Sequence, residues 1–411
     1  MVKSLLGSVK ATFGRAGIAV AFLLFTVSFV GSGAAAPRTT PITIGVLAPL
    51  SGPLASIGPA MRDGIEFYFK QHGYEIAGRP VKLIVEDTES DVAKGLTKVR
   101  KLVERDQASV LAGFVHSGVA LAARDYIDRQ GIPTVIAVAG IPELTQAAKS
   151  PHIFRVVRSF GQGDAVGGWY AFHKLGWRKI TMFYLDYAAG HAAAAGFKKS
   201  FVAAGGQVVE ELKPPLGTSD FAPFLSKISA SAGKIDGVWA YVVGADAIRL
   251  IKSYAEFGLK GRVKLFANAE IFSQAILAPQ GKDAVGHLSY SDENLYAGLA
   301  RRAPETLQFM SSFRNAYGRE AGSLESHGYV AAEVIAAAAK AVSGDIENRE
   351  AFENALRKVR FKSVEGREFA FDPNQGGVVD VVIQSMTEQQ GRVTREFGEI
   401  IPDVDQFWKP K

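Results

Sequence analysis

The stretch SVLAGFVHSGVALAARDYIDRQGIPTVIAVA (Ser109–Ala139) decides the fold class of this chain. Its first part, 109–114, is a short apolar run that predicts a buried strand, and 132–139 predicts another. Residues 118–130 lie between them and carry apolar side chains at helical spacing, which predicts a helix. A strand, a helix and a second strand in this order form a βαβ unit and indicate a parallel sheet.

The same alternation extends to both sides of this stretch. Upstream, it predicts strands at 42–50 and 81–90 and helices at 59–71 and 91–106. It restarts after residue 160 and continues to 268, so we predict two doubly wound α/β units in tandem. The second unit is expected to contain helices at 165–175, 192–204 and 245–257, a helix capped by Thr218-Ser219-Asp220, and strands at 179–186, 207–214, 237–243 and 263–268.

The pattern changes in the last quarter of the chain. Long helices are predicted at 304–318, 326–342 and 349–359, and short strand-like pieces follow them (REFAFDP, GGVVDVVIQSM and REFGEIIP). No stretch between 41 and 405 has the composition of a long linker. We therefore expect the two units to pack closely, with more than one crossing of the chain between them.

The composition is that of a globular protein and excludes several kinds of site. The 411 residues allow two domains, and 47% hydrophobic with 21% charged residues is ordinary for a protein with a full core. The absence of cysteine excludes cysteine nucleophiles, thiolate metal sites and disulfides. The formal charge of +6 includes three basic residues near the N-terminus, which leaves 44 basic against 41 acidic residues elsewhere. This balance gives no electrostatic footprint for nucleic acid.

The N-terminus has the layout of a secretory signal peptide. Lys3, Lys10 and Arg15 precede the uncharged run AGIAVAFLLFTVSFV, and small residues follow at 31–36. The run is shorter than the roughly 20 residues that a membrane-spanning helix needs. Pro37 would obstruct a cut directly before it, so we expect cleavage after Ala35, with 1–35 as the signal peptide. Export to the periplasm follows from this prediction, and an uncleaved membrane anchor is the alternative.

Sequence motifs of common enzymes are missing. The chain has no HExxH, no GxSxG and no GxxxxGK[ST] motif, and its seven histidines are scattered singly without metal-site spacing. Gly161, Gly163 and Gly167 form a GxGxxxG pattern that departs from the dinucleotide motif, and we interpret it as a turn. We therefore expect neither catalysis nor a metal or organic cofactor. A hydrolase acting in a cleft between the units is a third possibility, without a nucleophile–base pair to support it.

The most informative local motif is Val115-His116-Ser117-Gly118, between a predicted strand and a predicted helix. This position is the carboxyl end of a parallel strand, where open α/β sheets bind ligands. A helix N-terminus offers unpaired N–H groups, and the Ser117 hydroxyl can donate as well, so a carboxylate fits there. The alternative is that Ser117 only caps its own helix.

Other candidate residues lie at further strand ends. Val138-Ala139-Gly140 ends the strand after Ser117, and its small side chains let backbone groups approach a ligand closely. In the second unit, Tyr187 and Tyr241 follow or end strands, and Asn268-Ala269-Glu270 ends a later one. Each of these has a purely structural alternative, as a tight loop or a packed side chain.

Several blocks in the same order resemble the periplasmic binding proteins of ABC importers, in particular the leucine/isoleucine/valine-binding family. The resemblance covers 42–385, most of the chain after the predicted signal peptide. The blocks that carry it are ITIGVLAPLSGPLASIG (42–58), GIPTVIAVAGIPELTQ (131–146), HIFRVVRSFGQGDAVGGWYA (152–171), GTSDFAPFLSKI (217–228) and SHGYVAAEVIAAAAKA (326–341).

This resemblance implies an α/β protein with two doubly wound, Rossmann-like lobes joined by three crossovers, the type I periplasmic binding protein fold. The N-terminal lobe would be 41–158 plus 291–373, and the C-terminal lobe 159–290 plus 374–405. A small carboxylate ligand would lie in the cleft and favour a closed form by hinge motion. The partners would be ABC permease subunits at the inner membrane, and the protein itself would be a monomer.

The family's binding roles fall on particular residues of this sequence. Ser117 and the backbone at Ala139 and Gly140 would hold the ligand carboxylate, and Ile57 would touch the ligand side chain. Tyr187 and Tyr241 would contribute from the second lobe. The acidic residue that pairs with a ligand amino group falls near Glu270, although a gapless reading puts Ala269 there.

Because the match to the family's acidic residue is offset by one position, two classes of ligand are possible. If Glu270 binds an ammonium group, the ligand is a branched-chain amino acid; if it points elsewhere, the ligand lacks an amine. An aromatic carboxylate would suit Tyr187, Tyr241, Phe272 and Ile57, with a hydrogen bond from His116 or His191. The same fold also serves as a sensor of amides or aromatic acids that feeds a signalling partner, and the fold alone does not separate the two roles.

Overall fold

The computed structural model describes residues 40–52, 54–147 and 149–409, which belong to one compact unit, Arg38–Lys411. The predicted signal peptide, 1–35, lies outside the described residues. Within the described residues, no helix combines the length and the apolar character that crossing a membrane requires.

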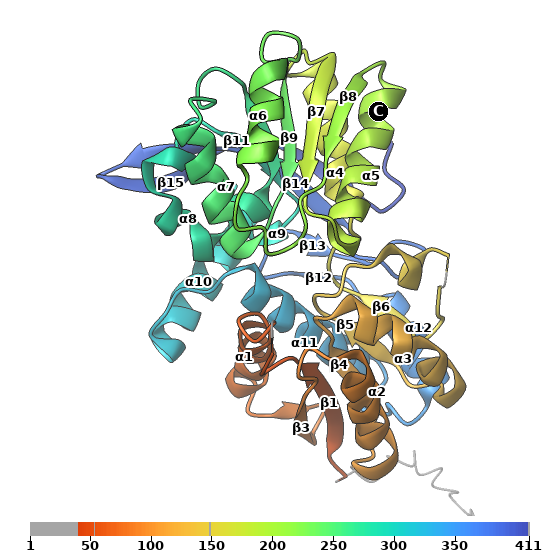
Figure 1. Cartoon of the computed structure of the whole chain (residues 1–411). Helices are drawn as coiled ribbons and strands as arrows, with labels where there is room; N and C mark the ends of the chain where they lie inside the picture. The colour runs from red at the N-terminus through yellow and green to blue at the C-terminus, as the bar shows by residue number, and fades with distance from the viewer. Residues whose placement is uncertain (1–39, 53, 148, 410–411) are drawn as a thin grey trace, which may run out of the picture. The chain divides into compact units, whose positions relative to one another are not determined.

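The first sheet has six strands in the order β2-β3-β1-β4-β5-β6 (Figure 1). β1 pairs in parallel with β3 and β4, and β5 pairs in parallel with β4 and β6, whereas β2 and β3 form an antiparallel hairpin. The strands are β1 (Ile42–Ala48), β2 (Glu75–Ile76), β3 (Arg79–Asp87), β4 (Val110–Gly113), β5 (Thr134–Ile136) and β6 (Ile153–Arg155).

Strand β1 is apolar except at Thr43, because both faces of the sheet are covered. Ile42, Ile44 and Val46 belong to one buried cluster with residues of the helices that follow β1 and β11. Leu47 belongs to a second cluster, on the opposite face, with residues 99–127. This two-sided burial is typical of parallel sheets in α/β proteins.

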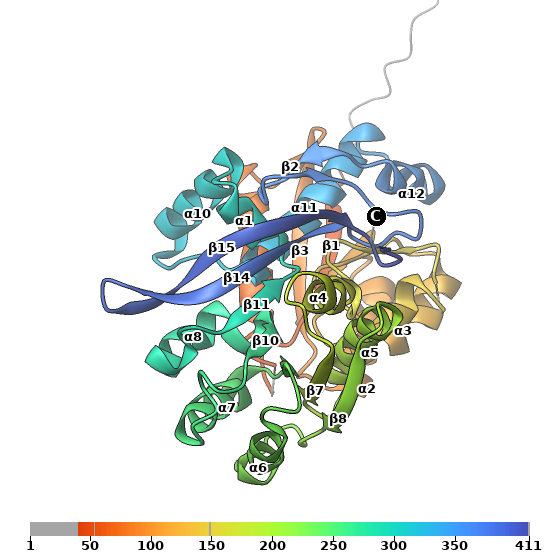
Figure 2. The same cartoon turned by 90° about the horizontal axis from the view of Figure 1, so that it is seen from above.

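The second sheet has seven strands in the order β15-β14-β11-β10-β9-β7-β8. The neighbours from β8 to β11 are parallel, and β14 and β15 form an antiparallel hairpin, which Figure 2 shows as a long twisted ribbon. The strands are β7 (Lys179–Tyr184), β8 (Gln207–Leu212), β9 (Gly237–Tyr241), β10 (Leu265–Asn268), β11 (Leu288–Ser291), β14 (Val379–Gln389) and β15 (Arg392–Val404).

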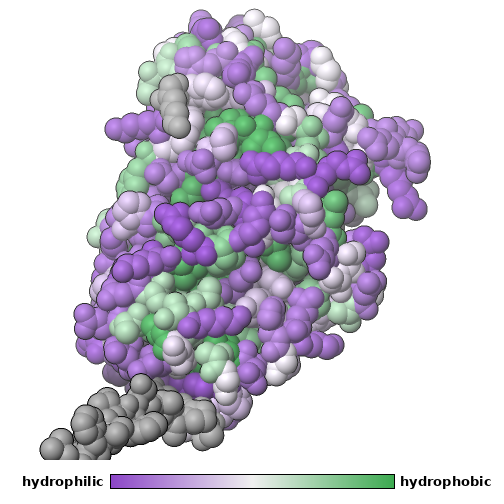
Figure 3. Space-filling model, turned by 180° about the vertical axis from the view of Figure 1, so that it is seen from behind, coloured by the Kyte–Doolittle hydropathy of each residue, from purple (hydrophilic) through white to green (hydrophobic). Residues whose placement is uncertain are grey.

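Helices cover both faces of each sheet, and the apolar side chains gather in the cores between them. Figure 3 shows hydrophilic side chains over most of one face of the molecule, with apolar ones in recesses. The helices are α1 (Gly58–Gln71), α2 (Val92–Arg100), α3 (Ser117–Gln130), α4 (Gln162–His173), α5 (Ala188–Ala203), α6 (Ala222–Ser231), α7 (Gly244–Glu256), α8 (Gln274–Gln280), α9 (Asn294–Ala300), α10 (Pro304–Tyr317), α11 (Ser323–Ala341) and α12 (Arg349–Arg357).

Short helical turns complete these elements. A π-helical turn follows α2 at Lys101–Arg105, and 3₁₀ turns form at Pro142–Thr145, Ala269–Phe272 and Gly281–Ala284.

The chain passes more than once between the two sheets. It leaves the first sheet after β6, enters the second with α4, and returns after β11, since residues of α9 to α12 pack in the core of β1. It leaves again after a small hairpin of β12 (Phe361–Lys362) and β13 (Glu368–Phe369), and β14 and β15 then join the second sheet. The prediction of two doubly wound α/β units is confirmed, and the exact lobe boundaries stay a prediction.

Two local predictions were wrong. The GxGxxxG pattern is a turn only at its first glycine: Gly161 lies in the turn before α4 as the N-cap, whereas Gly163 and Gly167 lie inside the helix. A Cβ at Gly163 would lie 2.4 Å from Asp292, and one at Gly167 would lie 2.5 Å from the Tyr290 ring, so these glycines permit close packing. The strand predicted at 132–139 is shorter, because β5 ends at Ile136.

His287, beside β11, should make the stability of this protein depend on pH. Its ring stacks on Phe272 at a centroid distance of 6.0 Å and meets Tyr254 edge-on at 5.8 Å. Burial disfavours the charged imidazolium and lowers the pKa of His287 from 6.5 to about 4. Below pH 6.5 the unfolded chain therefore binds a proton on His287. In the folded protein this side chain stays neutral until the pH falls to about 4.

Acidification from pH 7 to pH 5 should therefore cost about 2 kcal/mol of unfolding free energy through His287 alone. In the variant His287→Phe, which keeps an aromatic ring at this place, the loss between these pH values should be smaller by that amount. Urea unfolding of the wild type and the variant at pH 7 and pH 5 measures this loss of unfolding free energy. Equal losses in the variant and the wild type would contradict the assignment of this pH dependence to His287.

Candidate functional site

A cavity of about 2690 Å³ opens where strands of both sheets end. Its lining includes residues one or two positions beyond the carboxyl ends of four strands: Val115 after β4, Val243 after β9, Ala269 after β10 and Asp292 after β11. This is the position at which open α/β sheets bind ligands. The volume exceeds the roughly 300–1,000 Å³ of a typical small-molecule pocket, so a small ligand fills only part of the cavity.

The structure brings six of the eight predicted site residues to this cavity. Ala139 and Gly140 are not part of its lining, although Val138 and Ile141 are. The Ala139 amide already donates to the Phe114 carbonyl at 2.8 Å, and the Gly140 carbonyl accepts from Phe160 at 2.7 Å. A ligand-binding role for these two backbones stays a prediction. The six lining residues are Ile57, His116, Ser117, Tyr187, Tyr241 and Glu270.

The N-terminus of α3 differs from the simple alternative in which Ser117 caps its own helix. His116 is the N-cap, and its ring Nδ1 accepts a hydrogen bond from the Gly118 amide at 2.9 Å. Ser117 is the first helical residue, and its hydroxyl has no hydrogen-bond partner in the part of the chain that the structure describes. This hydroxyl is therefore available at a helix end that favours a negative charge.

Two tyrosines form an aromatic wall on the side of the second sheet. The rings of Tyr187 and Tyr241 lie 6.4 Å apart at an angle of 38°. Burial raises the pKa of Tyr187 to about 12 and that of Tyr241 well above 10, so both phenols are neutral at physiological pH. Ile57, Phe160 and Tyr296 also line the cavity, which gives it surfaces suited to an apolar or aromatic ligand body.

Two further candidates from the sequence, His191 and Phe272, are not available to a ligand in the same way as Ser117. His191 lines the cavity, but its Nε2 already pairs with Asp186 at 2.6 Å, and both side chains are about half exposed. Phe272, the further aromatic candidate, is fully buried against His287 and does not line the cavity.

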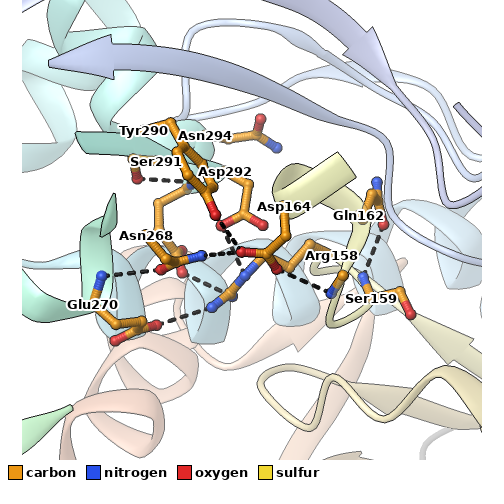
Figure 4. A network of polar contacts seen from close by, with 12 residues as sticks. Arg158, Ser159, Gln162, Asp164, Asn268, Glu270, Tyr290, Ser291, Asp292 and Asn294 are labelled. Atoms are coloured by element: carbon orange, nitrogen blue, oxygen red, sulfur yellow. Dashed lines mark hydrogen bonds and ion pairs between the residues drawn. The ribbon is translucent and has the colours of Figure 1, made fainter. Parts of the chain in front are cut away.

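The strongest electrostatic feature of the cavity is Arg158, which the sequence analysis missed. Its Nη2 pairs with Glu270 at 2.9 Å, its Nε with Asp292 at 2.8 Å and its Nη1 with Glu293 at 2.7 Å. All four residues line the cavity, and Figure 4 shows Glu270 and Asp292 meeting the guanidinium. Glu270 is therefore engaged with a positive charge of the protein itself.

Burial and pairing shift the pKa values in this cluster in different directions. Burial raises the pKa of Asp292 to about 7, against the influence of Arg158, and it also raises that of Glu270. Glu293 is buried too, but Arg158 and His327 lower its pKa to about 2. His327 Nε2 lies 2.7 Å from Glu293, and this carboxylate raises the His327 pKa despite burial.

A second buried network fixes the backbone next to Glu270. Asp164, on α4, accepts from the Tyr290 hydroxyl at 2.6 Å and from the Asn268 side-chain amide at 2.9 Å. The Asn268 oxygen in turn accepts from the Glu270 amide at 3.0 Å. The strand end that carries Glu270 is therefore held by residues of α4 and β11 (Figure 4).

Two α/β units with a polar and aromatic cavity at their strand ends define a ligand-binding protein. The family model of the periplasmic binding proteins matches residues 41–391, and this chain belongs to that family. It is 29% identical over 283 residues to the Leu/Ile/Val-binding protein homolog 6 of Brucella melitensis biotype 1. This alignment covers 68% of this chain and 70% of that protein. The predicted fold, the predicted family and the expectation that this is not an enzyme are thereby confirmed.

Solved structures agree with this assignment. An ABC transporter substrate-binding protein from Sphaerobacter thermophilus is 36% identical with a TM-score of 0.83, and covers 89% of this chain and 99% of that chain. A solute binding protein from Rhodopseudomonas palustris BisB5, in complex with 3,4-dihydroxy benzoic acid, is 26% identical with a TM-score of 0.80 over 89% and 99%. Another from Rhodopseudomonas palustris, in complex with benzoate, is 29% identical with a TM-score of 0.77 over 89% and 98%.

Proposed function

We propose that this protein is the exported substrate-binding component of an ABC importer and captures a small carboxylate with an apolar or aromatic body. The ligand would lie between a lobe of 41–158 plus 291–373 and a lobe of 159–290 plus 374–405. Closure of the lobes would present it to permease subunits at the inner membrane. The cleaved signal peptide, 1–35, and a periplasmic location belong to this proposal.

The observation that carries the proposal is the free Ser117 hydroxyl at the N-terminus of α3, in the same cavity as the aromatic pair Tyr187 and Tyr241. A carboxylate would accept hydrogen bonds at the helix end, and the tyrosine rings would contact the ligand body. Benzoate and 3,4-dihydroxy benzoic acid, the ligands in the two Rhodopseudomonas palustris structures, combine these two features.

Calorimetric titration of the purified protein with benzoate, 4-methylpentanoate and leucine tests this function. Ser117→Ala should weaken the binding of the preferred carboxylate by about 5- to 100-fold, because a charged oxygen loses one buried donor. Ser311→Ala is the matched control, since this serine is exposed on α10 and outside the cavity lining. An unchanged dissociation constant in Ser117→Ala would remove Ser117 from the site, and binding of none of these acids would refute the carboxylate function.

A further inference from the structure

Three carboxylates converge on one place in the wall of the cavity. Glu270 follows β10, and Asp292 and Glu293 follow β11, the neighbouring strand of the second sheet. The side chains of Asp292 and Glu293 are 3% and 12% exposed, so an unpaired charge there would be costly. A cluster of this kind requires a cation, and the ammonium group of an amino acid would be a suitable one.

The protein supplies that cation itself. Each of the three guanidinium nitrogens of Arg158 pairs with a different carboxylate, at 2.7–2.9 Å. The Arg158 side chain is 9% exposed and lies over the Phe160 ring, 5.9 Å from its centroid, so the guanidinium is held in place. His327 Nε2 lies 2.7 Å from Glu293 on the same side, and a protonated His327 adds a second positive group there.

We propose that Arg158 determines the substrate class of this cavity by excluding ligands that carry an α-ammonium group. Arg158 occupies the position among Glu270, Asp292 and Glu293 that a ligand ammonium would otherwise take. An amino acid would have to displace the guanidinium or place a second cation beside it, and either change is unfavourable. The cavity then selects carboxylates without an amine. This inference rests on the proposed carboxylate-binding function.

Pairs of ligands that differ only in the amine test the substrate class. We expect the wild type to bind 4-methylpentanoate and 3-phenylpropanoate at least about 100-fold more tightly than leucine and phenylalanine, respectively, because the amine meets a like charge. Calorimetry at pH 7 measures all four dissociation constants. Equal or tighter binding of the amino acids would overturn the inference and leave the carboxylate function intact. Binding of no ligand in either pair, and of no benzoate either, would refute the function, and the inference with it.

The variant Arg158→Met tests the residue itself. It removes the guanidinium but keeps an unbranched side chain, so the carboxylates become free to receive an ammonium. We expect the preference for the amine-free acids to shrink at least about 10-fold, and Arg158→Lys, which keeps a cation, to retain it. Arg367→Met is the matched control: Arg367 also pairs with two acids, Asp380 and Asp403, but it does not line the cavity.

Each outcome for the Arg158 variants either supports or overturns the proposed role of Arg158. An unchanged preference in a folded Arg158→Met protein would overturn the role of Arg158, and so would an equal change in Arg367→Met. If Arg158→Met does not fold, the double variant Arg158→Met with Asp292→Asn removes one of the uncompensated buried charges. Glu270 and Glu293 remain in it to receive an ammonium, so it should show the same loss of preference, and a retained preference would again overturn the proposal.

Discussion

Replacing Gly328 by valine should lower the free energy of unfolding by about 3 kcal/mol or more, because the added atoms have no space. Gly328 lies in α11, where that helix packs against α1 (Figure 1). A Cβ at Gly328 would lie 2.0 Å from the Met61 carbonyl oxygen and 3.1 Å from the Ile65 amide nitrogen. The contact is reciprocal, since a Cβ at Gly64 of α1 would lie 2.0 Å from the Glu325 carbonyl oxygen.

The obstructing atoms belong to the backbone of α1, so a rotamer change cannot relieve the clash. α1 is itself fixed, because Met61, Ile65 and Phe69 are buried in the core with β1. Urea unfolding with circular dichroism measures the loss. Gly398→Val, in β15, is the control, because a Cβ there would meet only the Ile383 carbonyl oxygen, at 3.4 Å. A Gly328→Val protein as stable as the wild type would show that α1 and α11 can move apart without cost.

This contact illustrates which parts of the fold the sequence can predict. Apolar periodicity predicted a helix at 326–342, close to the observed α11 at Ser323–Ala341, because helical spacing is a local property. The same pattern gave no sign that Gly328 meets Met61 of a distant helix, since that depends on how α1 and α11 cross. The three-residue strand β6 was not predicted at all, because so short a segment shows no period.

Some residues of the candidate site could be predicted from the sequence, and others could not. Ser117, Tyr187 and Tyr241 could be predicted because they follow or end strands, and parallel strands bring their carboxyl ends to one edge. Arg158 could not, because its partner Glu270 is 112 positions away and nothing local marks the pair. An available signal was the acidic pair Asp292-Glu293 directly after a buried strand, which requires a cation somewhere in the fold.

Asp164 should be the second position at which one substitution has a large effect, since Asp164→Ala leaves two buried donors unpaired. The Tyr290 hydroxyl and the Asn268 amide both donate to the same oxygen of Asp164, and Tyr290 also accepts from the Trp239 indole at 2.9 Å. All four side chains are buried. Burial also raises the pKa of Asp164, because it disfavours the charged carboxylate.

The expected loss for Asp164→Ala is about 2–4 kcal/mol of unfolding free energy, the cost of stranding buried polar groups. Tyr290→Phe removes one donor to Asp164 and the acceptor of the Trp239 indole, and should cost about 1–2 kcal/mol. Because the two side chains share one hydrogen bond, the double variant should cost less than the sum of the single ones. Urea unfolding of the three variants measures this coupling. Additive losses would mean that Asp164 and Tyr290 stabilise the fold independently, and that the strand end carrying Glu270 is fixed by other contacts.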